Sequence, residues 1–244
     1  MKQTIFTINE NTALTDSVYK MMLSGDTEGI ACGQFVNLKL DGLYLRRPIS
    51  VCDCVGDTLT LVYKVVGKGT EQMSTMKAGE KLDVLTGLGN GYDLTACTDK
   101  VCLLGGGVGV PPLYMLAKQL IKAGKSVSVI LGFNTKSEVF YEEEFKALGA
   151  DVTVTTVDGS YGTKGFVTDV LNKIDYTYFY TCGPEPMLRA VYKASESEGQ
   201  FSFEERMGCG FGACMGCSCK TVTGYKRICK DGPVLRKGEI LWED

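Results

Sequence analysis

Five of the eleven cysteines in the chain lie close together near the C-terminus, within the segment Met207–Lys230. Four of them follow the order C-x4-C-x2-C…C, namely Cys209, Cys214, Cys217 and Cys229. This is the order found in plant-type 2Fe–2S clusters, in which four thiolates hold two iron ions. Glycines between the cysteines let the backbone turn its N–H groups toward the sulfur atoms, and a negatively charged cluster needs such donors. The spacing therefore predicts a 2Fe–2S cluster held by these four residues.

Other uses of these cysteines are also compatible with the sequence. Four thiolates can hold a structural zinc ion, although zinc sites usually combine two C-x2-C pairs and this segment does not. Disulfide bonds are disfavoured, because eleven cysteines without an export signal indicate a reducing compartment. Cys219 lies two residues after Cys217 and is an alternative ligand, but the spacing favours Cys217.

The composition is that of a globular protein with packed cores. The chain has 244 residues, of which 44% are hydrophobic, enough for two modest domains and an appendage. Its net charge of −3 and its scattered Lys and Arg residues give no basic stripe for nucleic acid. Residues 1–20 lack the apolar core of a signal peptide, and no apolar run reaches the ~18 residues of a membrane span. We therefore expect a cytoplasmic protein that binds neither nucleic acid nor membranes.

The chain contains no histidine. This absence excludes a Rieske-type centre, a Ser-His triad, histidine-ligated zinc and acid–base catalysis by imidazole. Hydride and electron transfer remain open, because a nicotinamide or a flavin brings its own chemistry and the protein need only bind and orient it.

Residues 1–96 predict an antiparallel β-barrel. Five segments carry β-branched and aromatic residues at nearly alternate positions, with Gly, Asn and Asp between them. These segments are residues 4–8, 17–23, 34–40, 44–52 and 58–66. Residues 79–91 add a last strand and a glycine-rich loop, and residues 92–100 read as a linker. Short strands at this spacing favour a barrel.

Two motifs in the barrel region have groups that bind phosphate or a flavin. Arg46–Ser50 places cationic and hydroxyl side chains at the end of an apolar strand, where Pro48 lacks an N–H group. Gly67–Thr70 precedes a predicted short helix that runs to Met76, and a helix N-terminus behind glycines can bind an anion. Taken singly, such motifs are more often a basic edge strand or a glycine turn.

From Val101 the pattern changes to alternating strands and helices. Val101–Leu104 is a predicted buried strand, Gly105–Gly109 follows it, and Pro111 opens an apolar helix. The glycines let a diphosphate approach the backbone, although the motif G-x-G-x-x-G is not satisfied. Strands at 126–133, 151–156 and 177–181 alternate with helices near 138–148, 165–174 and 185–197. This alternation predicts a parallel sheet with helices on both faces and a ligand at its C-terminal edge, where Cys182-Gly183-Pro184 lies.

Together these motifs resemble the ferredoxin reductase superfamily. In chain order they are Arg-Pro-Ile-Ser, Gly-Lys-Gly-Thr, Gly-Gly-Gly-Val-Gly-Val-Pro-Pro, Cys-Gly-Pro and the cysteine motif. Over essentially the whole chain they are most similar to the electron-transfer subunits of type B dihydroorotate dehydrogenases, and Glu204–Gly210 is the most specific part. The resemblance implies an FAD-binding β-barrel over residues 1–96, an NAD-binding α/β domain over 97–200 and a small 2Fe–2S domain over 201–244.

The same resemblance implies three sets of site residues. FAD would be held by Arg47, Pro48, Ile49, Ser50, Val62, Tyr63, Lys64, Gly69 and Thr70. NAD would be received by Gly105, Gly106, Gly107, Gly109, Cys182, Gly183 and Pro184. Cys182 would lie near the reacting atoms of nicotinamide and flavin, which makes it the candidate catalytic residue. The cluster would be held by Cys209, Cys214, Cys217 and Cys229.

The resemblance further implies a division of labour between two kinds of chain in pyrimidine biosynthesis. A separate catalytic subunit would oxidise dihydroorotate at FMN. Electrons would then pass singly through the 2Fe–2S cluster to FAD and leave as a hydride to NAD. Two copies of each chain would form a heterotetramer, with the cysteine loop and the tail Val234–Trp242 facing the partner.

Two other functions are compatible with the sequence. Similar flavin and iron–sulfur modules serve NADPH:ferredoxin reductases and sulfide dehydrogenases, although the compact cysteine loop favours the dihydroorotate family. A zinc-stapled nucleotide-binding sensor is the non-enzymatic alternative, and it would be colourless where a flavoprotein is yellow-brown. The choice of NAD over NADP depends on the family alone, because Asn134–Ser137 offers neither an acidic ribose ligand nor an arginine.

Overall fold

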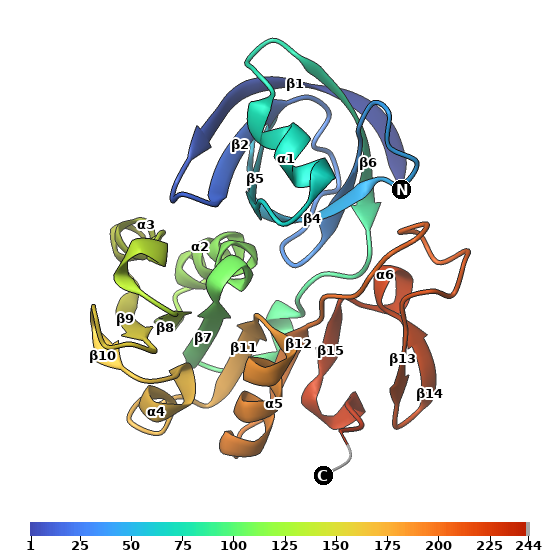
Figure 1. Cartoon of the computed structure of the whole chain (residues 1–244). Coiled ribbons are helices and arrows are strands. Elements are labelled where there is room, and N and C mark those ends of the chain that lie inside the picture. The colour runs from blue at the N-terminus through green and yellow to red at the C-terminus, as the bar shows by residue number, and fades with distance from the viewer. Residues whose placement is uncertain (243–244) are drawn as a thin grey trace.

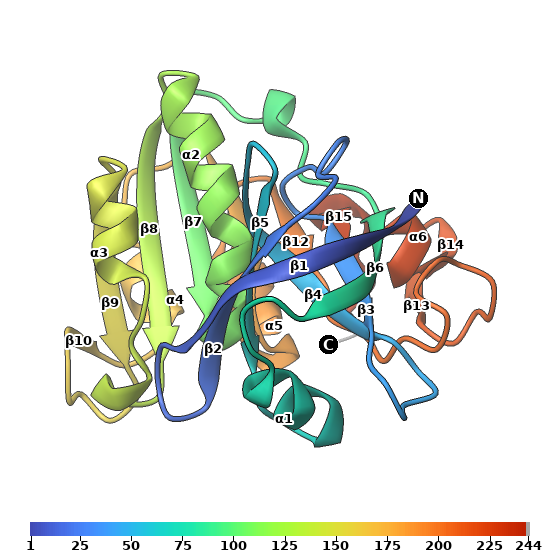
Figure 2. The ribbon, with the colours of Figure 1, turned by 90° about the horizontal axis from the view of Figure 1, so that it is seen from above.

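Six antiparallel strands close into a barrel in the N-terminal part of the chain (Figure 1). The computed structural model describes residues 1–242. In the barrel the strands follow the order β1-β2-β5-β4-β3-β6. Their bounds are β1 Lys2–Ala13, β2 Val18–Ser24, β3 Phe35–Lys39, β4 Arg47–Val55, β5 Thr58–Lys64 and β6 Lys81–Leu88. The helix α1 (Lys68–Thr75) lies across one end of the barrel (Figures 1 and 2).

Alternation of side chains explains why these segments form the barrel. In β1 and β5 the buried side chains lie two residues apart, as Phe6 and Ile8 or Leu59 and Leu61 do, and they fill the interior. The predicted antiparallel barrel is thereby confirmed. β1 extends further than the apolar pattern indicated, because residues 10–13 pair with β2 although they are half-buried or exposed.

A second sheet of seven strands follows the barrel in sequence, in the order β10-β9-β8-β7-β11-β12-β15. Its strands are β7 Lys100–Gly106, β8 Ser126–Phe133, β9 Asp151–Thr156, β10 Thr163–Lys164, β11 Tyr178–Cys182, β12 Gly199–Ser202 and β15 Val234–Arg236. All neighbouring pairs are parallel except β12 and β15. The helices α2 (Tyr114–Lys122) and α3 (Glu142–Ala147) cover the face next to the barrel, and α4 (Val167–Leu171) and α5 (Glu185–Ala194) cover the other face (Figure 1). The predicted parallel sheet with helices on both faces is confirmed.

The C-terminal part of the chain forms a small unit beside both layers (Figure 1). It consists of the cysteine loop (residues 207–217), a hairpin of β13 (Ser218–Thr221) and β14 (Gly224–Arg227), and the helix α6 (Ile228–Asp231). β15 then returns to the large sheet, where Val234 and Leu235 are buried. The start of the tail that we expected to face a partner is therefore part of the sheet. The boundary expected between residues 200 and 201 falls inside β12.

Short 3-10 turns connect the larger elements. They are η1 Leu94–Ala96, η2 Gly107–Gly109, η3 Pro111–Leu113, η4 Lys136–Glu138 and η5 Lys237–Glu239. η1 lies in the predicted linker between the barrel and the sheet. None of the helices within residues 1–242 is long and apolar enough to cross a membrane.

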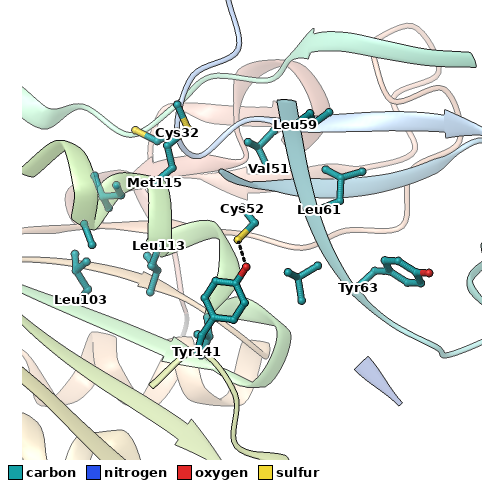
Figure 3. Close-up of a cluster of buried hydrophobic side chains, with 14 of the residues drawn as sticks. Cys32, Val51, Cys52, Leu59, Leu61, Tyr63, Leu103, Leu113, Met115 and Tyr141 are labelled. Atoms are coloured by element: carbon teal, nitrogen blue, oxygen red, sulfur yellow. Dashed lines mark hydrogen bonds between the residues drawn. The ribbon is translucent and has the colours of Figure 1, made fainter. Parts of the chain in front are cut away.

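The barrel and the sheet share one buried interface (Figure 3). Val51, Leu59 and Leu61 of the barrel face Leu113 and Met115, which follow the glycine loop Gly105–Gly109.

A buried polar contact crosses the same interface. The thiol of Cys52 donates a hydrogen bond to Tyr141 Oη at 3.2 Å, and burial raises the pKa of Cys52 to about 12. Lys118 Nζ of α2 forms an ion pair with Asp53 Oδ2 of β4 at 2.6 Å. These contacts fix the barrel relative to the sheet.

Candidate functional site

A cleft of about 800 Å³ opens where the barrel, the C-terminal edge of the sheet and the C-terminal segment meet. The barrel contributes Phe35, Pro48, Ser50, Val62, Tyr63 and Lys64 to its lining. The sheet contributes Gly106, Gly107, Val108, Gly109, Cys182, Gly183 and Pro184. The C-terminal segment contributes Phe203, Glu204, Glu205, Met207 and Pro233. Most residues predicted to hold FAD and most predicted to receive NAD thus line a single cleft.

The side of the cleft that is predicted to hold the flavin consists of side chains from β4 and β5. Pro48 and Ser50 lie two residues apart on β4 and face the cleft, whereas Ile49 between them packs against the barrel core. Tyr63 Oη donates to Asn11 Oδ1 at 3.0 Å, and burial raises the pKa of Tyr63 to about 12. A flat apolar wall with a few fixed polar groups suits an isoalloxazine ring.

Arg47 and the first turn of α1 lie together outside the cleft lining. Gly69 lies so close to Arg47 that a Cβ atom on this glycine would overlap the guanidinium group. Thr70 Oγ1 accepts the N–H of Val66 at 2.9 Å and so orders the start of the helix. Among residues 1–242, Arg47 forms no ion pair with a carboxylate, and it donates instead to the carbonyl of Leu45 at 2.6 Å. A guanidinium without a carboxylate partner, beside a helix N-terminus, fits a diphosphate.

On the side that is predicted to receive NAD, two backbone loops pack against each other at the ends of β7 and β11. A Cβ atom on Gly109 would overlap the carbonyl of Cys182 and lie 2.6 Å from Gly183 Cα. A Cβ atom on Gly106 would lie 2.5 Å from Met187 Sδ. Gly105 is different, because it faces Val110 and Leu113 and does not line the cleft. The glycines therefore allow the two loops to meet at the C-terminal edge of the sheet, where such sheets bind ligands.

Cys182 lies at the end of β11, next to Gly105 of β7 and Ser202 of β12. Burial raises the pKa of its thiol to about 12, with a smaller contribution in the same direction from Glu204 and an opposing one from Ser202. The thiol is therefore protonated at neutral pH, so Cys182 cannot act as a thiolate nucleophile.

This raised pKa predicts how hydride transfer depends on pH. Between about pH 6 and pH 9 the thiol stays neutral, and the chain contains no histidine that could titrate in that range. We expect the rate of flavin reduction by NADH, measured by stopped-flow absorbance, to be flat over this range. An inflection that disappears in a Cys182→Ala variant would contradict the assignment of a neutral thiol.

The cysteine loop already presents N–H groups to sulfur atoms. Cys209 Sγ accepts the N–H groups of Ala213 at 3.2 Å and of Cys214 at 3.4 Å. Cys214 Sγ accepts the N–H of Gly216 at 3.5 Å, and Cys217 Sγ accepts the N–H of Cys229 at 3.4 Å. This is the donor arrangement that a charged iron–sulfur cluster requires.

Backbone hydrogen bonds link the four cysteines two by two. Burial opposes ionisation of Cys209, but hydrogen bonds from backbone N–H groups and from Cys214 outweigh it and lower the pKa of Cys209 to about 6. Burial and a hydrogen bond with Cys217 raise the pKa of Cys229. Cys209 is thus linked to Cys214, and Cys217 to Cys229, through the N–H of the second cysteine of each pair.

Two pairs of thiolates fit two iron ions better than one zinc ion. In a 2Fe–2S cluster each iron takes only two protein thiolates, so paired sulfurs are what the group needs. Cys219 lies on β13 opposite Lys226 of β14, whereas Cys217 is buried beside Cys229. The donor set therefore fits a 2Fe–2S cluster and supports Cys217 over Cys219.

Some residues of the cleft were not predicted from the sequence. Glu138 lies just past the segment inspected for a ribose ligand, and its Oε2 accepts both the backbone N–H and the Nδ2–H of Asn134, at 3.1 and 2.9 Å. Both side chains line the cleft beyond β8. Phe35, Met207 and Pro233 also line it, although they come from distant parts of the chain. Glu138 could have been predicted as a ribose ligand because it is an acidic residue shortly after the second strand of the sheet domain.

Two family models match the chain. The model described as the iron–sulfur cluster binding domain of dihydroorotate dehydrogenase B matches residues 204–241. The model described as the oxidoreductase NAD-binding domain matches residues 103–193.

Solved structures share the fold. The structure of the NADH-dependent reduced ferredoxin-NADP oxidoreductase superposes with a TM-score of 0.88 and 30% identity, covering 97% of this chain and 90% of that one. A ferredoxin NADP+ reductase from Neisseria gonorrhoeae superposes with a TM-score of 0.68 at 17% identity, over 80% of this chain and 90% of that one.

Two curated relatives match almost end to end. The dihydroorotate dehydrogenase B (NAD(+)) electron transfer subunit of Geobacillus sp. (strain WCH70) is 46% identical over 99% of both chains. The protein of the same name from Fusobacterium nucleatum is 46% identical over 96% of both chains. The chain belongs to the family of dihydroorotate dehydrogenase B electron transfer subunits.

Proposed function

We propose that this chain accepts electrons at a 2Fe–2S cluster held by Cys209, Cys214, Cys217 and Cys229 and delivers them through FAD to NAD+. The observation that carries this proposal is the arrangement of one cleft. Its lining joins a flavin wall, a nicotinamide loop and residues on both sides of the paired cysteines. The chain would thus be the electron-transfer subunit of an NAD-dependent dihydroorotate dehydrogenase.

Bound FAD would exchange single electrons with the cluster and a hydride with NAD+, which is why a flavin must stand between them. The chain binds and orients these groups. Pro48, Ser50 and Tyr63 would hold the ring of the flavin, and Arg47 with the N-terminus of α1 would hold its diphosphate. The remaining members of the flavin set are Ile49, Val62, Lys64, Gly69 and Thr70.

The glycine loop and the loop after β11 would receive the nicotinamide half of NAD. Gly106, Gly107 and Gly109 would let the diphosphate approach the backbone, and Cys182 would place a neutral thiol beside the reacting atoms. Gly183 and Pro184 complete this wall, and Gly105 would act through packing beneath it.

Glu138 supports NAD rather than NADP. A carboxylate at the end of the second strand can accept hydrogen bonds from ribose hydroxyls and repels a 2′-phosphate. Asn134 holds this carboxylate in place. The exposed Lys136 is the nearby cation, and its ammonium lies 5.7 Å from the centre of the Tyr161 ring.

The partner would be an FMN-containing catalytic chain that oxidises dihydroorotate, with two copies of each chain in a cytoplasmic complex. The exposed surface of the cysteine loop supports this proposal. Cys214 is exposed, and the apolar side chains of Phe211 and Tyr225 nearby are 44% and 73% exposed. The domains that we propose are residues 1–96 for FAD, 97–200 for NAD and 201–244 for the cluster, with β15 returning to the sheet.

The runner-up function is a flavin and iron–sulfur subunit of an NADPH:ferredoxin reductase or a sulfide dehydrogenase. The structural likeness to an NADH-dependent ferredoxin-NADP oxidoreductase favours it, but at 30% identity against 46% for the dihydroorotate dehydrogenase relatives.

Co-expression with an FMN-containing dihydroorotate dehydrogenase chain tests the proposal. We expect a complex that reduces NAD+ with dihydroorotate, and neither chain alone should do so. A complex that forms but reduces only NADP+ or ferredoxin would favour the runner-up instead.

A further inference from the structure

Asn37 of β3 is a buried carboxamide in an otherwise apolar part of the barrel. It is 1% exposed, and Val36 and Leu38 beside it in the strand are fully buried. Its Nδ2 donates to the carbonyl oxygen of Cys209 at 3.3 Å. Its Oδ1 is buried and has no hydrogen-bond partner among the described residues.

The stability of the barrel does not explain an asparagine at this position. A buried carbonyl group without a donor is unfavourable, and an apolar side chain of the same size would avoid that cost. An unsatisfied buried group in a folded protein calls for a functional reason. The one hydrogen bond that the side chain makes leads out of the barrel, to the first cysteine of the predicted cluster.

The cysteine loop is shaped to receive this amide. Gly210 follows Cys209 and has a φ of +78°, a conformation that favours glycine. A Cβ atom on Gly210 would overlap Asn37 Nδ2 and lie 3.3 Å from its Cγ. The loop therefore approaches the amide at a residue that only glycine can occupy without displacement.

The same strand also touches the flavin cleft. Phe35 lies two residues before Asn37, lines the cleft, and belongs to the buried cluster that contains Cys217 and Cys229. β3 thus connects the proposed flavin wall to the cysteine loop through Phe35 and Asn37, which lie two residues apart in the strand.

The other end of the cysteine segment is held in a similar way. Asn90 exchanges hydrogen bonds with the backbone of Val234 at 2.9 and 3.0 Å.

We propose that Asn37 is a positioning residue for electron transfer, which holds the Cys209 end of the loop against the barrel and so fixes the separation between cluster and flavin. This inference rests on the proposed function, because it requires a cluster at the four cysteines. Electron tunnelling weakens steeply with separation, so a loosened loop slows transfer even when both cofactors are bound. Replacing a residue that hydrogen-bonds to a metal ligand commonly lowers metal affinity or activity by about 10–100-fold.

The test compares Asn37→Leu with a matched control, Gln200→Met. Gln200 is an equally buried carboxamide, 1% exposed, and its Nε2 donates to the carbonyl of Asp93 at 2.8 Å, away from the cysteine loop. We expect Asn37→Leu to keep its FAD and its melting temperature, yet to lose iron to a chelator about tenfold faster than wild type. Backbone amide exchange in residues 207–217 of the cluster-free protein should accelerate as well. Gln200→Met should lower the melting temperature and leave iron retention unchanged.

Gly210→Ala tests the same contact from the loop side without altering the barrel. It should reproduce the faster iron loss and the faster amide exchange, and in both variants the midpoint potential of the cluster should shift while that of the flavin does not. Wild-type iron retention and amide exchange in both variants would overturn the role of Asn37. A wild-type protein without iron and sulfide would refute the proposed function instead, so the two failures are distinguishable.

Discussion

Replacing Cys214 with serine should abolish electron transfer from the catalytic partner and leave NADH oxidation by an artificial flavin acceptor close to the wild-type rate. Cys214 is the exposed member of its pair, and its sulfur accepts the N–H of Gly216. A serine hydroxyl is a poor ligand for an iron–sulfur cluster, so the cluster should be missing from the purified variant. Cys214 does not line the cleft that we propose for flavin and nicotinamide, and therefore hydride transfer should persist.

Cys219→Ser is the matched control for this prediction. Cys219 lies in the same segment, but it is located on β13, and the structure pairs Cys217 with Cys229. We expect this variant to retain iron, sulfide and both activities. The two activities can be measured as dihydroorotate-dependent NAD+ reduction by the complex and as NADH:acceptor turnover by the single chain. Equal loss of both activities in Cys214→Ser would contradict the separation of the sites.

Gly109→Ala should slow flavin reduction by NADH by about a hundredfold, because a displacement of about 1 Å at a reacting centre can have an effect of that size. The added Cβ atom would overlap the carbonyl of Cys182, and this neighbour is backbone, which cannot rotate away. The loop that carries Cys182 and Gly183 must therefore move. Stopped-flow reduction of the bound flavin measures the change, and the FAD content should stay at the wild-type level.

Gly238→Ala is the control for an added methyl group. A Cβ atom on Gly238 would meet nothing within 4 Å, so its rate of flavin reduction should equal that of wild type. If Gly109→Ala reduced its flavin as fast as this control, the contact between the two loops would have no part in holding NAD.

The barrel and most of the sheet are predictable from the sequence because their signals are local. β-branched and aromatic residues at nearly alternate positions mark β1 to β5, and buried strands followed by helices mark β7, β8, β9 and β11. β15 has no such signal, since Val234–Arg236 is three residues long and is defined by its pairing with β12. Pairing between distant segments is a tertiary property that no local period reveals.

The site divides in the same way. The cysteine spacing and the glycine loop are continuous in sequence, and both are visible as motifs. Phe35, Met207 and Pro233 line the same cleft from distant parts of the chain, and they share only their place in the fold. Asn37 is a further example, because a single polar residue in an apolar strand has no meaning until Cys209 is found beside it.

Anaerobic titration of the purified single chain with NADH, followed by visible absorbance and electron paramagnetic resonance, tests the central claim most directly. We expect about two iron and two sulfide per chain together with one FAD, as a 2Fe–2S flavoprotein requires. NADH should first bleach the flavin absorbance and then produce the resonance of a reduced 2Fe–2S centre. A chain that binds FAD but contains one zinc, no acid-labile sulfide and no NADH-dependent resonance would contradict it.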